Sequence, residues 1–282
     1  MSDALTNSGA IGVFDSGVGG LTVLNALRAV LPNENLVYLG DTARVPYGTK
    51  SALSVMRYAE QAAKALMQRD VKALVIACNT ASAMALEHLQ ICYPGIPVLG
   101  VIEPGADAAC AVSCTGAVGV IATEATTNNQ AYQKAILRRN PQARVRAQAC
   151  SLFVGLAEEG WHEGDLVEQI VARCLAPLMK SHEGEGVLDT LVLGCTHFPV
   201  LQAAIQKVVG KDVQLVDSAR TTAAAVRDLL HGNGLLNAQA STGDIQFLVT
   251  DSPERFVRVA NNFFNEAISS AEVELVDIQH YT

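Results

Sequence analysis

The sequence lacks a long apolar run, although hydrophobic residues make up 50% of its 282 positions. A helix that crosses a bilayer needs roughly 20 consecutive apolar residues, so we expect no membrane partner. The sequence also lacks a cationic start followed by an apolar core. We therefore expect no secretory signal and a cytoplasmic location.

Basic charge is scarce as well. The chain has 20 Lys and Arg residues against 28 Asp and Glu residues, which gives a net charge of −8 at pH 7. Surfaces that bind nucleic acid present clustered Lys and Arg side chains to the phosphates, and this sequence contains no such run. We therefore expect no nucleic-acid partner.

The seven cysteines are odd in number and irregularly spaced. Their spacing forms neither a paired disulfide framework nor a Cys-x-x-Cys or His-x-x-x-His metal framework. We therefore expect free thiols and no metal ion. Because most buried cysteines act as small apolar residues, a functional cysteine has to be identified from its neighbours.

Short apolar runs rich in β-branched residues alternate with helical patterns. Continuous apolar runs are typical of strands covered on both faces, as in a parallel sheet. The alternation predicts an α/β fold with ligands at the carboxyl ends of the strands. The expected strands are Ile11–Phe14, Leu36–Leu39, Ala73–Ala77, Val98–Val101, Val118–Ala122, Thr190–Leu193, Val213–Val216 and Ile245–Val249. The main expected helices are Ser51–Gln68, Ala81–Ile91, Gln130–Arg139, Asp165–Met179, Val200–Val209 and Ala219–Leu230.

Two pairs of segments resemble each other and come in the same order. Ala10–Ser16 resembles Ala117–Thr123, offset by 107 residues (117 − 10), and Val75–Thr80 resembles Val192–His197, offset by 117 (195 − 78). Chance similarity between strands is the alternative, but the shared order favours duplication. We predict two pseudo-symmetric parallel-sheet α/β domains with the active site between them. The first domain comprises residues 1–100 and 212–282, and the second comprises residues 101–211.

Cys78 follows an apolar strand and begins a helix. The N-terminus of a helix stabilises a thiolate, and Asn79 and Thr80 supply neutral donors beside it. A buried cysteine with an Asn/Thr cap is the structural alternative. Cys195 recurs at the matching place of the second unit, followed by Thr196 and His197. The histidine could set the protonation of that thiol.

Two polar loops complete the candidate site. The loop 15–20, Asp-Ser-Gly-Val-Gly-Gly, follows the first strand and opens a helix, and its glycines allow the backbone to approach a ligand closely. Its spacing fits neither a dinucleotide fingerprint nor a P-loop. Asp15 is either a helix cap or a group that handles protons. The loop after the second strand contains Pro46, Tyr47 and Gly48.

Two thiols that face one pocket suit the inversion of a stereocentre. One base removes the proton from one face of Cα, and a second group delivers a proton to the other face. Two pseudo-symmetric domains around one ligand supply that geometry. The pattern therefore predicts an amino-acid racemase that works through Cys78 and Cys195 without a cofactor, with Asp15 and His197 as helpers.

The motifs together resemble those of bacterial glutamate racemases, in the aspartate/glutamate racemase superfamily. The resemblance runs from about Ile11 to Phe264. It is carried by Asp-Ser-Gly-Val-Gly-Gly (15–20), Pro-Tyr-Gly-Thr-Lys (46–50), Ala-Cys-Asn-Thr-Ala-Ser (77–82), Gly-Val-Ile-Glu-Pro-Gly (100–105), Leu-Gly-Cys-Thr-His-Phe-Pro (193–199) and Val-Asp-Ser (216–218). The chain departs from the family pattern at Ser151, Gly155 and 128–130.

The resemblance implies a cofactor-independent isomerase that interconverts L- and D-glutamate and supplies D-glutamate for peptidoglycan, and thereby for cell wall biogenesis and cell shape. It implies that Cys78 and Cys195 are the bases, with Asp15 and His197 as partners and Glu158 as an acid near His197. The residues implied to contact glutamate are Ser16, Tyr47, Gly48, Asn79, Thr80 and Thr196. Thr123, Thr126 and Thr127 are implied near the substrate or the domain interface.

Other functions remain open at this point. An aspartate or hydantoin racemase of the same superfamily is the nearest alternative. A zinc hydrolase, a pyridoxal enzyme and a non-catalytic ligand-binding protein of similar fold are further alternatives. The sequence leaves open whether the chain is a monomer or a homodimer.

Overall fold

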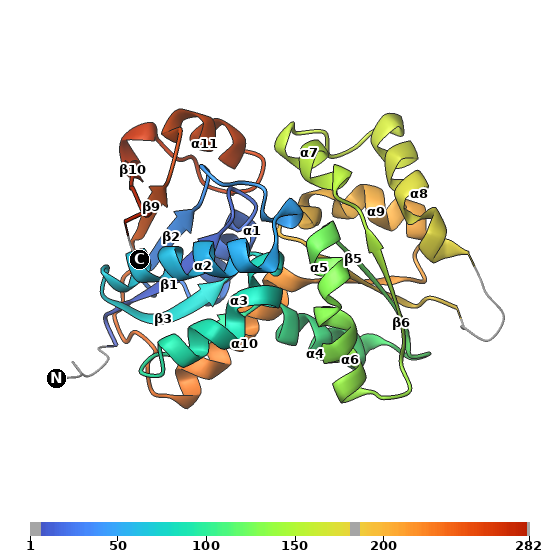
Figure 1. Ribbon diagram of the computed structural model, residues 1–282, viewed down its shortest axis with the longest axis horizontal. Coiled ribbons are helices and arrows are strands. Elements are labelled where there is room, and N and C mark those ends of the chain that lie inside the picture. Colours follow the sequence, from blue (N-terminus) through green and yellow to red (C-terminus); the bar gives the residue numbers. More distant parts are fainter. Residues whose placement is uncertain (1–6, 181–186, 281–282) are drawn as a thin grey trace.

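The computed structural model describes residues 7–180 and 187–280, and its two lobes lie side by side (Figure 1). The first lobe is built on a six-stranded sheet in the order β10-β9-β2-β1-β3-β4. All of its strand pairs are parallel. The strands are β1 (Ala10–Asp15), β2 (Leu36–Gly40), β3 (Val71–Ile76), β4 (Val98–Gly100), β9 (Ile245–Val249) and β10 (Val273–Leu275).

The second lobe is built on a four-stranded parallel sheet in the order β6-β5-β7-β8. Its strands are β5 (Ala117–Ala122), β6 (Arg144–Ala149), β7 (Thr190–Gly194) and β8 (Gln214–Asp217). This order repeats the order β2-β1-β3-β4 of the first sheet, so β7 corresponds to β3. The predicted α/β fold with two related parallel sheets is confirmed.

Helices cover both sheets, and the expected helices agree closely with those observed. The α-helices are α1 (Leu21–Val30), α2 (Ala52–Met67), α3 (Asn79–Cys92), α4 (Ile102–Val112), α5 (Glu124–Asn129), α6 (Ala131–Arg139), α7 (Leu152–Glu158), α8 (Asp165–Met179), α9 (Gln202–Val209), α10 (Ser218–Gly232) and α11 (Pro253–Ala260). Short 3₁₀ turns are η1 (Tyr47–Thr49), η2 (Phe198–Leu201) and η3 (Ser270–Glu272). Every residue of β1, β3 and β5 is buried, as expected for strands covered on both faces.

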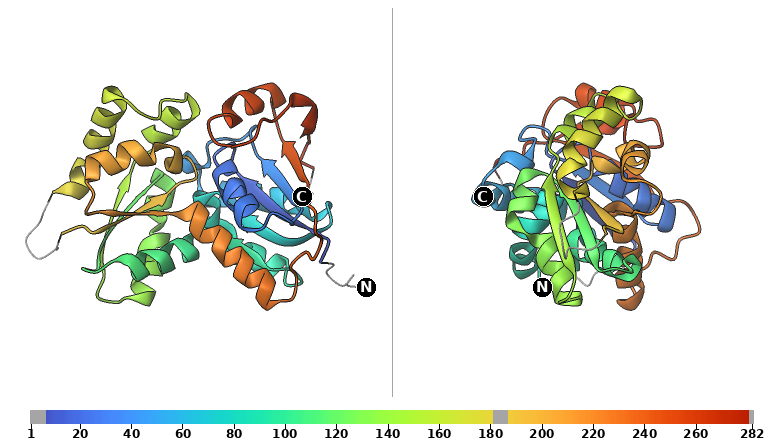
Figure 2. Two further views of the ribbon diagram at one scale, coloured as in Figure 1. Left: turned by 180° about the vertical axis from the view of Figure 1, so that it is seen from behind. Right: turned by 90° about the vertical axis from the view of Figure 1, so that its right-hand side faces the viewer.

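One strand lies on the other side of the predicted domain boundary. The sequence prediction places residues 212–282 in the first domain, but β8 pairs with β7 in the second sheet. The chain returns to the first lobe through α10, which packs against α1 and α4 (Figure 2). The sequence could not show this, because a buried parallel strand reads alike in either sheet. The rest of the predicted division stays a prediction.

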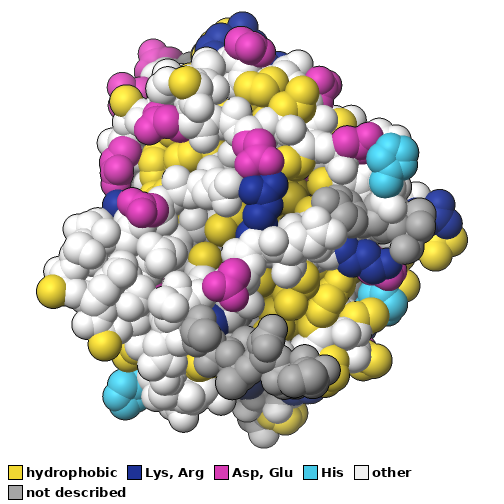
Figure 3. All heavy atoms as spheres, turned by 90° about the vertical axis from the view of Figure 1, so that its left-hand side faces the viewer, with side chains coloured by type: hydrophobic (Ala, Val, Ile, Leu, Met, Phe, Trp, Pro, Cys, Tyr) yellow, Lys and Arg dark blue, Asp and Glu magenta, His cyan; other side chains and the backbone are white. Residues whose placement is uncertain are grey.

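The surface agrees with the composition. Within the described ranges, no helix is long and apolar enough to cross a membrane. The face shown in Figure 3 carries acidic and basic side chains scattered among apolar and neutral ones, and no continuous basic surface is seen on it.

Candidate active site

A small pocket lies between the two lobes at the carboxyl ends of the central strands. Both cysteines line it, and its cavity is about 20 Å³, which is room for little more than one water molecule. The site residues predicted from the sequence that line it are Ser16, Tyr47, Gly48, Cys78, Asn79, Thr80, Thr123, Cys195, Thr196 and His197. Val45, Pro46 and Val154 complete the lining. No sequence pattern marked the two valines, because an apolar residue in a loop or helix is usually a packing residue.

Cys78 is the N-cap residue of α3 and is 5% exposed. Its sulfur accepts a hydrogen bond from the backbone N–H of Ala81 at 3.5 Å, and its thiol donates to Ser16 Oγ at 3.6 Å. Burial, helped by the charge of Asp15, raises the pKa of Cys78 to about 12. The expectation that the helix N-terminus favours a thiolate is therefore wrong for this state, because burial and the carboxylate outweigh the N–H groups. Cys78 is a neutral thiol here.

Cys195 follows β7 directly, as Cys78 follows β3, but no α-helix begins at it. Its backbone carbonyl accepts from Phe198 N, and the 3₁₀ turn η2 precedes α9. The sulfur lies 3.8 Å from His197 Nδ1, and both residues are buried. Burial alone would lower the pKa of His197, but hydrogen bonds to Cys195 and Glu158 raise it to about 10. His197 is therefore an imidazolium at neutral pH.

Asp15 ends β1, is fully buried, and does not line the pocket. Its carboxylate accepts from Gly17 N at 2.9 Å and from Thr196 Oγ1 at 3.4 Å, so it connects the two lobes. Burial raises the pKa of Asp15, while the charge of His197 lowers it. The carboxylate thus acts electrostatically on both Cys78 and His197.

In the loop 15–20, Gly19 packs directly against residues of the second lobe. A Cβ at Gly19 would collide with the imidazole of His197 and the hydroxyl of Thr196. The expectation that the loop's glycines let a ligand approach the backbone stays a prediction. The missing side chain lets the first lobe approach the histidine of the second.

Hydroxyl groups join the lobes on the other side of the pocket. Thr80 Oγ1 lies 3.0 Å from Thr123 Oγ1 and 3.0 Å from Thr126 Oγ1, and these two lie 3.1 Å apart. Thr126 does not line the pocket, so its contact with the site runs through the other two hydroxyls. Thr127 does not line it either, and its hydroxyl is buried without a hydrogen-bond partner among the described residues.

The hydroxyl of Tyr47 is held by a carboxylate that lies outside the pocket lining. Its hydroxyl donates to the fully buried carboxylate of Asp41, which also accepts from Arg44 Nε at 2.7 Å and Thr250 Oγ1 at 2.9 Å. Burial and the charge of Asp41 raise the pKa of Tyr47, so its phenol stays protonated. Asp41 thus fixes the turn that presents Tyr47 and Gly48 to the pocket.

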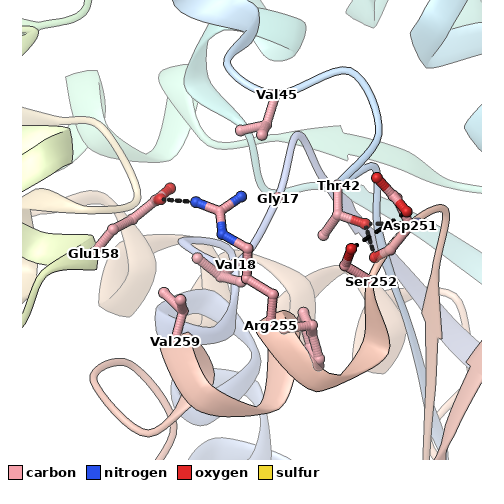
Figure 4. A pocket seen from close by; sticks show the side chains of 10 residues that line it. Gly17, Val18, Thr42, Val45, Glu158, Asp251, Ser252, Arg255 and Val259 are labelled. Carbon is pink, nitrogen blue, oxygen red and sulfur yellow. Dashed lines mark hydrogen bonds and ion pairs between the residues drawn. The ribbon is translucent and has the colours of Figure 1, made fainter.

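Glu158 contacts His197 but does not line the pocket that holds the cysteines. Its Oε1 lies 3.3 Å from His197 Nε2, and its Oε2 lies 3.3 Å from Arg255 Nη2 of α11. Figure 4 shows the guanidinium of Arg255 reaching from α11 to this carboxylate, beside a second pocket of about 40 Å³. Hydrogen bonding to His197 lowers the pKa of Glu158. A line of contacts therefore crosses from the first lobe to the second through Arg255, Glu158, His197 and Cys195. No sequence pattern marked Arg255.

The described residues contain no group of three or more His, Cys, Asp or Glu side chains that could hold a metal ion. The zinc hydrolase alternative therefore finds no ligand set in that part of the chain.

A family model described as Asp/Glu/Hydantoin racemase matches residues 21–226. The chain belongs to this family. It is 52% identical over 254 residues to a glutamate racemase of Geobacter metallireducens, an alignment that covers 90% of this chain and 92% of the relative. The resemblance predicted from the motifs is thus confirmed.

Solved structures of glutamate racemases share the fold. One from Bacillus anthracis superposes with a TM-score of 0.90 at 38% identity, covering 96% of this chain and 98% of the other. One from Francisella tularensis, in complex with D-glutamate, gives a TM-score of 0.88 at 38% identity, covering 98% of this chain and all of the other (100%). The family membership therefore holds in sequence and in fold.

Proposed function

We propose that this family member is a glutamate racemase that moves a proton on and off Cα with Cys78 and Cys195. One observation carries the proposal: two buried cysteines follow equivalent strands of two related sheets and line one pocket. The glutamate racemase names of relatives that cover nearly the whole chain support glutamate as the substrate.

The proposed reaction is a proton relay across the substrate. A thiolate on one face takes the Cα proton, so the C–H bond breaks, an S–H bond forms, and the electron pair enters the carboxylate-stabilised carbanion. The thiol on the opposite face then gives its proton to Cα, and its own S–H bond breaks. The two sulfurs end with exchanged protonation states, and the reverse reaction uses them in the opposite order.

The resting charges favour one starting arrangement. Cys78 is a neutral thiol, whereas Cys195 lies beside the His197 imidazolium, which attracts an anionic sulfur. We propose that Glu158 holds His197 in this charged form and that Asp15 helps Cys78 to keep its proton. Glu158 and Asp15 act through their neighbours, since neither lines the pocket.

Neutral donors are proposed to bind the carboxylates of glutamate. Ser16, Asn79, Thr80 and Thr196 offer hydroxyl and amide groups at the pocket wall, joined by Tyr47, Gly48 and Thr123. Fixed dipoles of this kind stabilise a developing carbanion without reorganising. Because a cavity of about 20 Å³ cannot hold glutamate, the lobes must move apart or their side chains rearrange before binding. The proposal uses no cofactor or metal.

We propose that the chain acts in the cytoplasm and supplies D-glutamate for peptidoglycan, and that a homodimer is its assembly. Light scattering or sedimentation of the purified protein measures the assembly, and a monomer would contradict the homodimer.

An assay of L- and D-glutamate in separate reactions tests the activity. We expect optical rotation to decay to zero from both sides without added pyridoxal phosphate or metal. Aspartate and a hydantoin serve as competing substrates, and faster turnover of either would assign the chain to that branch of the family. A purely ligand-binding protein would leave the Cα proton of glutamate unexchanged in heavy water.

A further inference from the structure

Asn79 carries a buried side-chain amide in which only one of the two polar atoms has a hydrogen-bond partner. The residue is 3% exposed and lines the pocket. Its Oδ1 accepts a hydrogen bond of 2.7 Å from the hydroxyl of Tyr132, and its Nδ2 has no partner among the described residues. A buried donor without an acceptor is costly. The free N–H groups therefore indicate that a ligand acceptor belongs there.

Tyr132 reaches Asn79 from the other lobe. It lies in the first turn of α6 and is 1% exposed. Its ring is held between Gly105 and Gly194, where an added Cβ would lie 3.1 Å and 3.0 Å from ring carbons. Burial raises the pKa of Tyr132, against a hydrogen bond with Ser218 that lowers it. The phenol therefore stays protonated, and its hydroxyl donates the hydrogen bond to Asn79 from a fixed position.

We propose that Tyr132 is a positioning residue that sets the orientation of the Asn79 amide toward the substrate. An amide presents donors on one side and an acceptor on the other. With Oδ1 occupied by the Tyr132 hydroxyl, Nδ2 is the atom left for a carboxylate of the substrate. Without that hydroxyl, the amide is free to turn its oxygen toward the carboxylate, which repels it. This inference rests on the proposed function, because it takes glutamate as the ligand.

The hydrogen bond between Tyr132 and Asn79 also requires that the two lobes lie against each other. Asn79 belongs to the first lobe and Tyr132 to the second, and the hydrogen bond exists only while α3 and α6 meet. Any separation of the lobes would therefore break this hydrogen bond.

The variant Tyr132→Phe removes the hydroxyl and keeps the ring between the two glycines. We expect KM for both enantiomers of glutamate to rise about tenfold, the effect of one lost hydrogen bond in binding, with a smaller change in kcat. Asn79→Ala should raise KM at least as much. The double variant should resemble Asn79→Ala alone, because the hydroxyl acts only through the amide. Tyr93→Phe, at the far end of α3, is the matched control and should keep the KM of the original protein.

A binding measurement separates this inference from the proposed activity. Calorimetry of glutamate with Cys78→Ser protein, with and without Tyr132→Phe, should show an affinity about tenfold lower when the hydroxyl is missing. Unchanged affinity and KM in Tyr132→Phe, or KM increases that multiply in the double variant, would overturn the positioning role. A protein that binds glutamate with the expected tenfold loss but does not racemise it would refute the proposed function and keep the positioning role.

Discussion

The two cysteines occupy equivalent places in the two sheets, yet their surroundings differ. Cys78 has a hydroxyl, a helix N-terminus and the carboxylate of Asp15 near it, and it holds its proton. Cys195 has an imidazolium backed by Glu158. The repeated topology places a cysteine on each side of the pocket, and the neighbours that are not repeated give the two sulfurs different electrostatic surroundings. In the proposed relay the two sulfurs hold opposite protonation states at any moment and exchange them in each turnover.

Replacing either thiol should have the largest effect, because each is required on its own face. In Cys78→Ser and in Cys195→Ser we expect racemisation to fall about a thousandfold, the scale of a lost general acid or base, with folding kept. Initial rates from L- and D-glutamate measure it. Cys92→Ser, an exposed cysteine on α3, is the control. Near-normal turnover in either site variant would break the two-base account.

Glu158→Gln should weaken only the Cys195 side. The loss of one hydrogen bond to a charged group, roughly 1.5–3 kcal/mol, predicts a fall in activity of about 10- to 100-fold. The pKa of His197 should fall from about 10, so the alkaline loss of activity should begin at a lower pH. A pH–rate profile measures this shift, and Glu159→Gln, the exposed neighbouring acid, is the control. An unchanged alkaline limb would contradict the role of Glu158.

The same histidine makes folding stability depend on pH. Its folded pKa is about 10 against an ordinary value of 6.5. Its contribution is therefore complete below pH 6.5 and is lost as the pH rises through about 10. Thermal unfolding should show a falling Tm across that window, and the fall should be smaller in Glu158→Gln. An equal slope in both proteins would place the stabilising charge elsewhere.

Arg255→Gln should have the smallest effect. Arg255 is half-exposed, with 54% of its side chain accessible, and its ion pair with Glu158 spans 3.3 Å. An exposed ion pair contributes roughly 0–1 kcal/mol, so activity should fall no more than about fivefold, with a small downward shift of the alkaline limb. Arg258→Gln, one turn along α11, is the control. A loss as large as that in Glu158→Gln would mean that Arg255 touches the reaction directly.

The parallel sheets and the placement of both cysteines at one pocket could be predicted from the sequence, because β-branched runs and strand-end motifs are local signals. The list of expected strands omits β6 and β10, which lie at sheet edges and whose residues are largely uncovered or only partly covered. The sequence prediction also misjudged the charge of Cys78, because the burial and the approach of Asp15 arise only in the folded chain. Arg255 and Tyr132 could not be found, since each contacts a residue of the opposite lobe that lies far away in the sequence.

The fate of the Cα proton tests the central claim most directly. In heavy water, a two-base relay should give product that carries deuterium at Cα from the first turnovers, while recovered substrate still carries its original proton. Mass spectrometry of separated D- and L-glutamate at low conversion measures both. Product that retains the proton of its own substrate would show one base serving both faces, and the paired roles of Cys78 and Cys195 would fail.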